Sequence, residues 1–153
     1  MILDLDDLDR SLLRALAQEG DLSASELGRR FGLSQPAAWR RVRRMEEAGI
    51  LAGLRREVDR AALGFGVTVF LGVKLATKGR VSLEDFERAV SAIPEVQVVQ
   101  HVLGLFDYRL RVVARDVADF ERVLRRRIMT LPGVGQVEAN VLLSEESRPG
   151  PLG

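Results

Sequence analysis

A short motif occurs twice in the second half of the chain, and this repeat constrains the fold more than any other feature. The tetrapeptide DFER at residues 85–88 returns at 119–122, and a Pro-x-Val tripeptide at 94–96 returns at 132–134. The two offsets are 34 and 38 residues. We therefore predict two related helix-plus-strand units, and we expect the second helix to be longer than the first by about one turn.

Each repeat has the apolar spacing of a helix that packs on one side, and β-branched runs flank both helices. The helical stripes are Phe86, Ala89, Val90 and Ile93 in the first repeat, and Phe120, Val123, Leu124 and Ile128 in the second. The predicted strands are 67–75, 96–103, 108–113 and 137–143. This order of strand, helix, strand, strand, helix and strand is the ferredoxin-like βαββαβ plan of an α+β domain, which we assign to residues 61–144.

The predicted strand at 96–103 is apolar at both parities. Val96, Val98 and Val102 fall on one side, and Val99 and Leu103 fall on the other. A ferredoxin-like sheet is covered by helices on one face only, so an apolar second face needs a partner. The simplest partner is a second copy of the chain, and we predict a homodimer.

The first 60 residues have the pattern of three short helices, and the second and third form a helix-turn-helix at about residues 22–41. Ser23 and Glu26 have the spacing of a capping box, Gly32 supplies a left-handed helix stop, and Ser34 precedes the third helix. A wing or short extended segment at 50–58 follows. A second helix that enters the major groove is typical of this arrangement.

Charge is concentrated at this motif although the chain as a whole has a net charge of only +1. Residues 29–44 contain six arginines and no acidic residue. Clustered positive charge of this kind is typical of a duplex-DNA reader, because neutralised phosphates release counterions. The predicted DNA contacts are Arg29, Arg30, Ser34, Gln35, Pro36, Trp39, Arg40, Arg43 and Arg44.

Competing interpretations apply to Trp39 and to two further basic features, Arg41 and the arginine run at 125–127. Arg41 lies beside the apolar stripe of the third helix, so it could contact phosphate or form a salt bridge with the acidic first helix. Trp39 could pack on a sugar or a thymine methyl, or against the wing. The run of arginines at 125–127 is interpreted as solvated helix surface, with contact to wrapped DNA as the alternative.

Composition excludes several classes of protein. The chain has no cysteine and one histidine, so it lacks thiolate chemistry and cysteine zinc sites, and we expect no catalytic site, metal or cofactor. His101 is interpreted as structural. No run of about 20 apolar residues is present and the first residues are acidic, so we expect a cytoplasmic protein with no membrane partner. Residues 145–153 are predicted to be a flexible tail.

Taken together, these motifs make the chain resemble the Lrp/AsnC family of leucine-responsive and asparagine-responsive transcription regulators. The resemblance covers nearly everything from residue 5 to 144, and it depends on the order and spacing of several motifs. These are LDDLDR (5–10), EL (26–27), GLS (32–34), RVRRME (41–46), GIL (49–51), LG (63–64), PEV (94–96), GLFDY (104–108) and LPGV (131–134).

The resemblance implies a DNA-binding domain, a regulatory domain that dimerises through its sheet, and assembly of dimers, often into octamers. It also implies a small effector, typically an amino acid, near the Gly-x-x-Asp-Tyr turn. The residues assigned to this site are Leu103, Gly104, Leu105, Asp107 and Tyr108. Gly104 and Asp107 could equally be hairpin residues, with glycine at a positive φ and aspartate as a turn cap.

The chain departs from the family pattern at both sites. Leu103 stands where the family often has threonine, and Leu105 and Phe106 make the turn apolar, so either the effector is more apolar than usual or there is none. Gln35-Pro36 stands where the family often has Pro-Thr, which changes the expected base contacts.

We interpret the protein as a sequence-specific DNA-binding regulator, modulated by a small effector, and not an enzyme. A DNA-compacting architectural protein is the alternative within the same family. A third interpretation is an enzyme like the sirohaem decarboxylases, which resemble this fold, but the segment after the wing, where those enzymes carry histidine, has none here.

Overall fold

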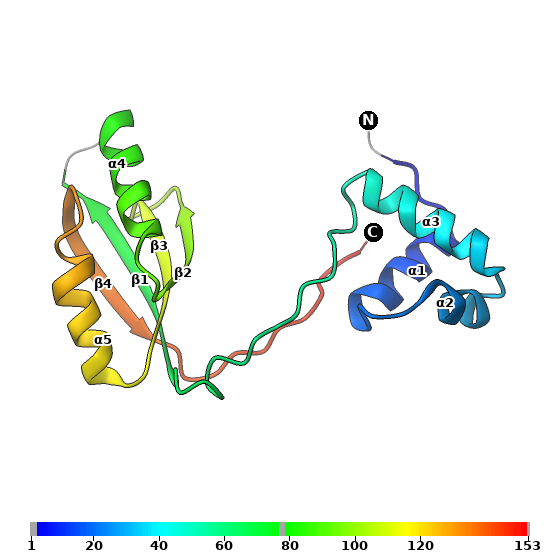
Figure 1. The fold of residues 1–153 in the computed structure, drawn as a ribbon. Helices are drawn as coiled ribbons and strands as arrows, with labels where there is room; N and C mark the ends of the chain where they lie inside the picture. Colours follow the sequence, from blue (N-terminus) through cyan, green and yellow to red (C-terminus); the bar gives the residue numbers. More distant parts are fainter. Residues whose placement is uncertain (1–2, 77–78, 153) are drawn as a thin grey trace. The chain divides into compact units, whose positions relative to one another are not determined.

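The structure is a computed structural model that describes residues 3–76 and 79–152, and it consists of two compact units. The first comprises Met1–Glu57 together with Glu146–Gly153, and the second comprises Val58–Glu145. The chain therefore leaves the first unit, forms the whole second unit and returns. The sequence alone predicted a boundary near residue 60 and a separate tail. Each unit is described by itself (Figure 1).

Three helices form most of the first unit: α1 (Asp7–Gln18), α2 (Ala24–Phe31) and α3 (Gln35–Glu47). Each begins at a side-chain cap, because Asp6, Ser23 and Ser34 accept hydrogen bonds from backbone N–H groups three residues later. The caps of α1 and α2 are full capping boxes. The predicted helix-turn-helix is thus confirmed, while residues 52–59 are irregular and contain no β-strand.

The turn between α2 and α3 depends on two glycines. Gly32 ends α2 in the left-handed conformation, with φ of 67°. Gly28 lies one turn earlier, and the Leu33 N–H donates to its carbonyl at 2.8 Å. A β-carbon at Gly28 would lie 2.5 Å from the Leu33 carbonyl oxygen, so no other residue fits while the turn keeps this form. The sequence analysis identified Gly32 but not Gly28.

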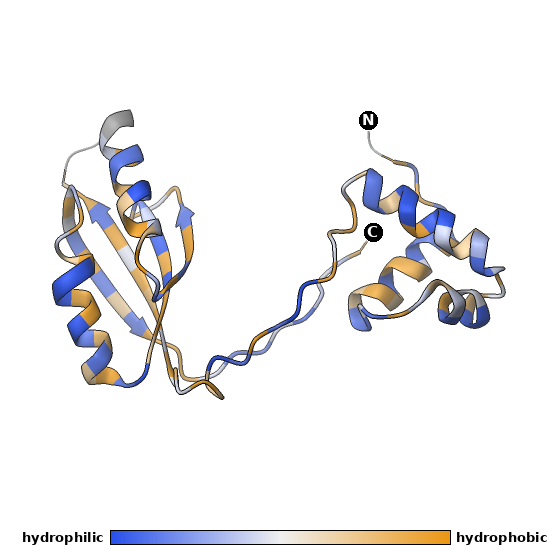
Figure 2. Cartoon of the chain, in the orientation of Figure 1, coloured by the Kyte–Doolittle hydropathy of each residue, from blue (hydrophilic) through white to orange (hydrophobic). Residues whose placement is uncertain are grey.

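The core of the first unit is small and is built from one side of each helix, as the hydrophobic stripes in Figure 2 indicate. Its buried apolar residues are Leu12, Leu13, Leu27, Ala38 and Met45. Ala38 and Met45 come from the predicted stripe of α3. That stripe therefore determines which side of α3 remains available for a partner.

The second unit has the predicted ferredoxin-like order: β1 (Val67–Leu75), α4 (Arg80–Ser91), β2 (Val96–His101), β3 (Tyr108–Ala114), α5 (Val117–Val123), a π-helical turn η1 (Leu124–Ile128) and β4 (Val134–Val141). The antiparallel sheet has the strand order β2-β3-β1-β4. Both helices pack on the same face of this sheet. The α+β prediction is confirmed, although β2 ends two residues earlier than expected and β4 begins three residues earlier.

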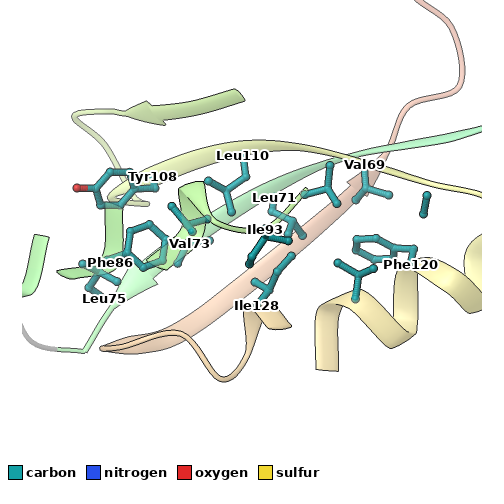
Figure 3. Packing of buried hydrophobic residues seen from close by; sticks show 14 residues of the cluster. Val69, Leu71, Val73, Leu75, Phe86, Ile93, Tyr108, Leu110, Phe120 and Ile128 are labelled. Carbon is teal, nitrogen blue, oxygen red and sulfur yellow. The ribbon is translucent and has the colours of Figure 1, made fainter. Parts of the chain in front are cut away.

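Side chains that alternate along β1 and β3 pack against the two helices to form one continuous core (Figure 3). Val69, Leu71 and Val73 pair in register with Val112, Leu110 and Tyr108. Phe86 of α4 and Phe120 of α5 are buried against this face. The predicted helical stripes are therefore the faces that the core uses.

The prediction that the second helix is longer by a turn was wrong. Residues 80–91 of α4 and residues 117–128 of α5 with η1 each span 12 residues. The second helix begins later relative to the repeated tetrapeptide and extends further beyond it. Its end has a π-helical turn, where the Met129 N–H donates to the Leu124 carbonyl at 2.8 Å. An offset between motifs measures where a helix ends, not how long it is.

The expected faces of β2 were also wrong, because the strand contains a bulge. Its register with β3 shifts between Val96 and Val98, so Val96 pairs with Val112 while Val99 pairs with Leu110. Val96 and Val99 consequently both pack against the helix-covered core, and Val98 lies on the other face. One inserted residue breaks the alternation on which a parity argument depends.

Candidate nucleic-acid interface and effector loop

The outer side of α3 presents the residues that a DNA-binding helix needs. Gln35, Pro36, Trp39, Arg40 and Arg43 are all exposed. They lie opposite the buried stripe of this helix. Ser34 is also exposed, but its hydroxyl already caps the helix by accepting from the Ala37 N–H at 3.3 Å.

Trp39 and Arg43 lie together on this side. The Arg43 guanidinium is 5.9 Å from the centre of the indole ring, a cation–π distance, and 55% of Trp39 is exposed. Arg43 also forms ion pairs with Glu46 and Glu47, at 3.3 and 3.5 Å. Within the described residues Arg40 has no ion pair. Exposed pairs of this kind are weak, so a phosphate could displace them.

Two other arginines of α3 bind acidic residues of and before α1. Arg41 donates to Asp6 at 2.7 Å and to Asp9 at 2.8 Å, which resolves its two interpretations in favour of the internal salt bridge. Arg44 donates to the second oxygen of Asp9, whose side chain is completely buried. The hydrogen bond from Arg41 lowers the pKa of Asp6 below its ordinary value.

The DNA contact of Arg44 stays a prediction, because 47% of its side chain is exposed while it pairs with Asp9. Arg44 follows Arg41 by three residues, so both lie on the same edge of the helix, and this edge faces α1. Asp9 was not singled out by the sequence analysis. The signal was present, since Asp6 and Asp9 have capping-box spacing and each accepts a backbone N–H from the other.

The pair of arginines at the end of α2 is likewise divided. Arg30 donates to both oxygens of Glu19, at 2.7 and 2.9 Å, and this pair lowers the pKa of Glu19. Arg29 is exposed and has no ion pair within the part of the chain that the structure describes. Of the two predicted phosphate contacts, Arg29 is thus the one whose guanidinium is uncommitted.

The loop between β2 and β3 presents two apolar side chains to solvent. Leu103 is fully exposed and Leu105 is 74% exposed. Gly104 between them does not adopt a left-handed conformation, so the proposed need for a positive φ was wrong. Phe106 instead packs over Gly72 of β1, where a β-carbon would lie 2.7 Å from the ring. The sequence did not predict this contact of Phe106.

Asp107 holds this loop against the end of β1. Its carboxylate accepts from the Leu75 N–H at 2.8 Å, and its own N–H donates to the Val73 carbonyl at 2.9 Å. Its carbonyl accepts from the Val102 N–H at 3.0 Å. Asp107 therefore caps the turn, which was one of its two predicted roles; the other was contact with an effector.

Tyr108 is placed in the core and not at the loop surface. Its ring is completely buried, 4.6 Å from the ring of Phe86 and stacked at 4.8 Å on His101. Its hydroxyl donates to Glu87 at 2.6 Å. Burial, and then the neighbouring Glu87 carboxylate, raise the pKa of Tyr108. The sequence predicted an effector contact here, but the register of β3 turns the ring toward the helices.

Within the described residues no helix is long and apolar enough to cross a membrane. The same part of the chain contains no group of three or more histidine, aspartate or glutamate side chains placed to hold a metal ion. These observations leave the α3 surface and the β2–β3 loop as the two candidate sites.

Comparisons with known proteins match each of the two units to a protein family. The Lrp/AsnC ligand binding domain family matches residues 68–152, and a winged helix-turn-helix DNA-binding family matches residues 5–52. The chain is 33% identical over 147 residues to a proline dehydrogenase transcriptional activator from Rhizobium radiobacter, covering 96% of this chain and 94% of that protein. It is 35% identical over 136 residues to a Bkd operon transcriptional regulator from Pseudomonas aeruginosa, covering 89% of each.

A solved structure has a similar fold. The complex of a transcriptional regulator from Neisseria meningitidis with L-Met superposes with a TM-score of 0.86 at 27% identity, covering 95% of this chain and 94% of that one. The relatives are named as transcriptional regulators, which confirms the expectation of a regulator and not an enzyme.

Proposed function

Because this chain belongs to the Lrp/AsnC family of transcriptional regulators, we propose that it reads DNA with one side of α3 and responds to a small apolar effector at the β2–β3 loop. Its first unit is a helix-turn-helix DNA-binding domain. Arg40, Arg43, Trp39 and Gln35 are assigned to the major groove, and Arg29 to the phosphate backbone.

The observation that carries this assignment is the division of the arginines of α3. Arg41 and Arg44 bind Asp9, which is completely buried, so they fix the helix to α1. Arg40 and Arg43 are exposed opposite the core and have at most weak surface pairs. The helix thus separates the cations that position it from the cations available to a polyanion.

The test is a mobility-shift titration of point variants on operator and random-sequence fragments. We expect Arg40→Ala and Arg43→Ala each to weaken binding by about tenfold or more, with a shallower salt dependence, because each removes one phosphate or base contact. Arg88→Ala removes an exposed arginine of α4 that, like Arg43, is ion-paired with an acidic residue of its own helix, and is the control. Wild-type affinity in both α3 variants would refute the assignment, and equal binding to both fragments would favour the DNA-compacting alternative.

The effector proposal is supported by the exposed apolar loop and by the family. Leu103 and Leu105 present hydrocarbon to solvent at a position where a protein gains by covering it. The Neisseria regulator was solved with L-Met, an amino acid with an apolar side chain. We therefore propose an amino acid of this kind as the effector, held near Leu103, Gly104 and Leu105. Asp107 and Tyr108 support the loop and the core beneath it.

A thermal-shift panel of amino acids tests this proposal. A ligand present at about 100 times its dissociation constant adds about 2.7 kcal/mol to the free energy of unfolding. We expect methionine, leucine and other apolar amino acids to raise the melting temperature and polar ones to have no effect. The Leu103→Ser variant should lose the response. A uniform lack of response across the panel would contradict the proposal.

We also propose that the chain works in the cytoplasm as a homodimer. These dimers assemble further, as members of this family often do to form octamers. The sheet face that the helices do not cover carries Phe70 and Val98, which are partly or well exposed, and a second copy would cover them. Two copies present two α3 helices, the number needed for half-sites one helical turn, about 34–36 Å, apart. Light scattering of the wild type and of Val98→Arg distinguishes an assembly through this face from a monomer.

A further inference from the structure

The last residues of the chain belong to the DNA-binding unit. Glu146–Gly153 are grouped with Met1–Glu57, although the whole second unit lies between them in sequence. Leu152 is partly buried and packs against the core cluster of the helix-turn-helix unit. The chain turns just before it, at Gly150, whose φ is 71° between two prolines.

Leu152 forms part of the wall of a hollow of about 520 Å³ in this unit. Leu3 and Leu5, which precede α1, line it together with Leu13 of α1 and Ile50, which follows α3, and Asp4 and Arg10 add two charged side chains. Of the four apolar residues, Leu13 is buried and the other three are partly exposed. Leu152 therefore shares this hollow with the segment that enters α1 and the segment that leaves α3.

These two segments border the charge network that positions the recognition helix. Leu5 is followed by Asp6, which caps α1 and binds Arg41. Ile50 follows Met45, a buried residue of α3, and donates its N–H to the Met45 carbonyl at 2.9 Å. A leucine that packs on this core beside both segments restrains α3 relative to α1, since packed side chains resist displacement.

We propose that the chain's own C-terminal segment docks on the helix-turn-helix unit through Leu152, beside this hollow, and that Leu152 is a positioning residue for the recognition helix. The second unit is consequently tied to the DNA-binding unit by two covalent connections, at residues 57–58 and 145–146. The tail is then a structural part of the DNA reader.

The first experiment removes the Leu152 side chain. Leu152→Ser and a chain that ends at Arg148 should both lower the melting temperature of the DNA-binding unit by about 4–8 °C, the shift expected for one partly buried leucine in a domain of this size. Trp39 is the single tryptophan of the chain and lies in α3, so its fluorescence follows this unit alone. Operator affinity should fall about three- to tenfold, because α3 is less restrained.

Leu143→Ser is the matched control, because Leu143 is a leucine near the same end of the chain, is 94% exposed and packs in neither core. It should leave the Trp39 transition and the operator affinity unchanged. A Leu152→Ser variant with the melting temperature and affinity of the wild type would overturn the proposal. So would an equal loss in Leu143→Ser.

The second experiment tests whether the docked C-terminal segment comes from the same chain. The sequence has no cysteine, so the double variant Leu152→Cys, Ile50→Cys offers one possible disulfide. Oxidation should give a cross-linked species with the mass of one chain on a denaturing gel, and Leu143→Cys, Ile50→Cys should give none. A cross-linked species with the mass of two chains would overturn docking of a chain's own tail, as would the absence of any cross-link. These outcomes do not depend on whether Arg40 and Arg43 contact DNA.

Discussion

The two units differ in what fills their interiors. Of the described residues, the first unit buries five apolar side chains together with the carboxylate of Asp9, whereas the second buries a cluster of fourteen apolar and aromatic side chains that includes Tyr108. The first unit supplements its small core with three capped helices and the pairs of Asp9 with Arg41 and Arg44. The second relies on continuous packing between a sheet and two helices (Figure 3).

This difference has a functional reason. A small apolar core gives limited stability, so directional contacts must hold the helices in register. Bidentate charge-assisted bonds have well-defined geometry, and geometry is what a helix that reads base edges requires. The sheet of the second unit, which we propose as the face for a second copy, is instead supported by a large apolar core. The contrast between polar and apolar support leads to predictions that can be tested in the two units separately.

The largest expected effect is at Gly28. Gly28→Val should destabilise the first unit by about 3 kcal/mol or more, because the side chain meets the backbone oxygen of Leu33, which cannot move without opening the turn. Urea unfolding followed by Trp39 fluorescence measures this change. Gly53→Val is the control in the same unit, since nothing lies within 4 Å of its β-carbon. Similar stability in the two variants would show that the turn is not sterically fixed.

A smaller effect is expected when the buried carboxylate is neutralised. Asp9→Asn should lower the free energy of unfolding of the first unit by about 2–3 kcal/mol, below the value for a fully buried pair because Arg41 and Arg44 remain partly solvated. Operator affinity should fall with it. Asp7→Asn, an exposed neighbour in the same first turn, should change neither quantity. If Asp9→Asn behaves like Asp7→Asn, polar contacts do not position α3.

The smallest effects concern pH. Carboxyls with lowered pKa values occur in both units, with Asp119 in the second, whereas the single tyrosine, whose pKa is raised, lies in the second unit. In the first unit, hydrogen bonds lower the pKa of Asp6, Glu19 and Glu26, chiefly bonds from Arg41, Arg30 and the Ser23 backbone N–H respectively. Carboxyls with lowered pKa values stabilise the fold above their unfolded pKa, and this contribution is lost as the pH falls below about 4. The first unit should therefore lose stability in acid, although these groups are exposed and the loss is modest.

In the second unit, the raised pKa of Tyr108 has the reverse consequence. The neutral phenol is favoured in the folded state, so stability is intact below the ordinary pKa of 10.0 and declines as the pH rises above it. Hydrogen exchange of β1 and β3 peptides at about pH 8 and about pH 11 measures this loss, and Tyr108→Phe should remove it. An equal loss of stability in both units between about pH 8 and about pH 11 would contradict the comparison.

Sequence patterns were most informative where a contact is local. Caps at Ser23 and Ser34, the stop at Gly32 and the stripe of α3 depend on residues within one or two turns, and all were found in the structure. The repeat of residues 85–88 gave the strand and helix order of the second unit. Local spacing failed where one residue is inserted, as in the bulge of β2 and the π-helical turn after α5.

The sequence by itself determined the two folds, the basic helix and the family, because periodicity, caps and motif order are properties of neighbouring residues. Only the tertiary structure decided which arginines of α3 bind Asp9, that Tyr108 is core and that Leu152 joins the first unit. These outcomes depend on pairs far apart in the chain, such as residues 9 and 44. Which of several exposed charges finds a buried partner is fixed by packing, and packing brings together residues whose separation in sequence carries no signal.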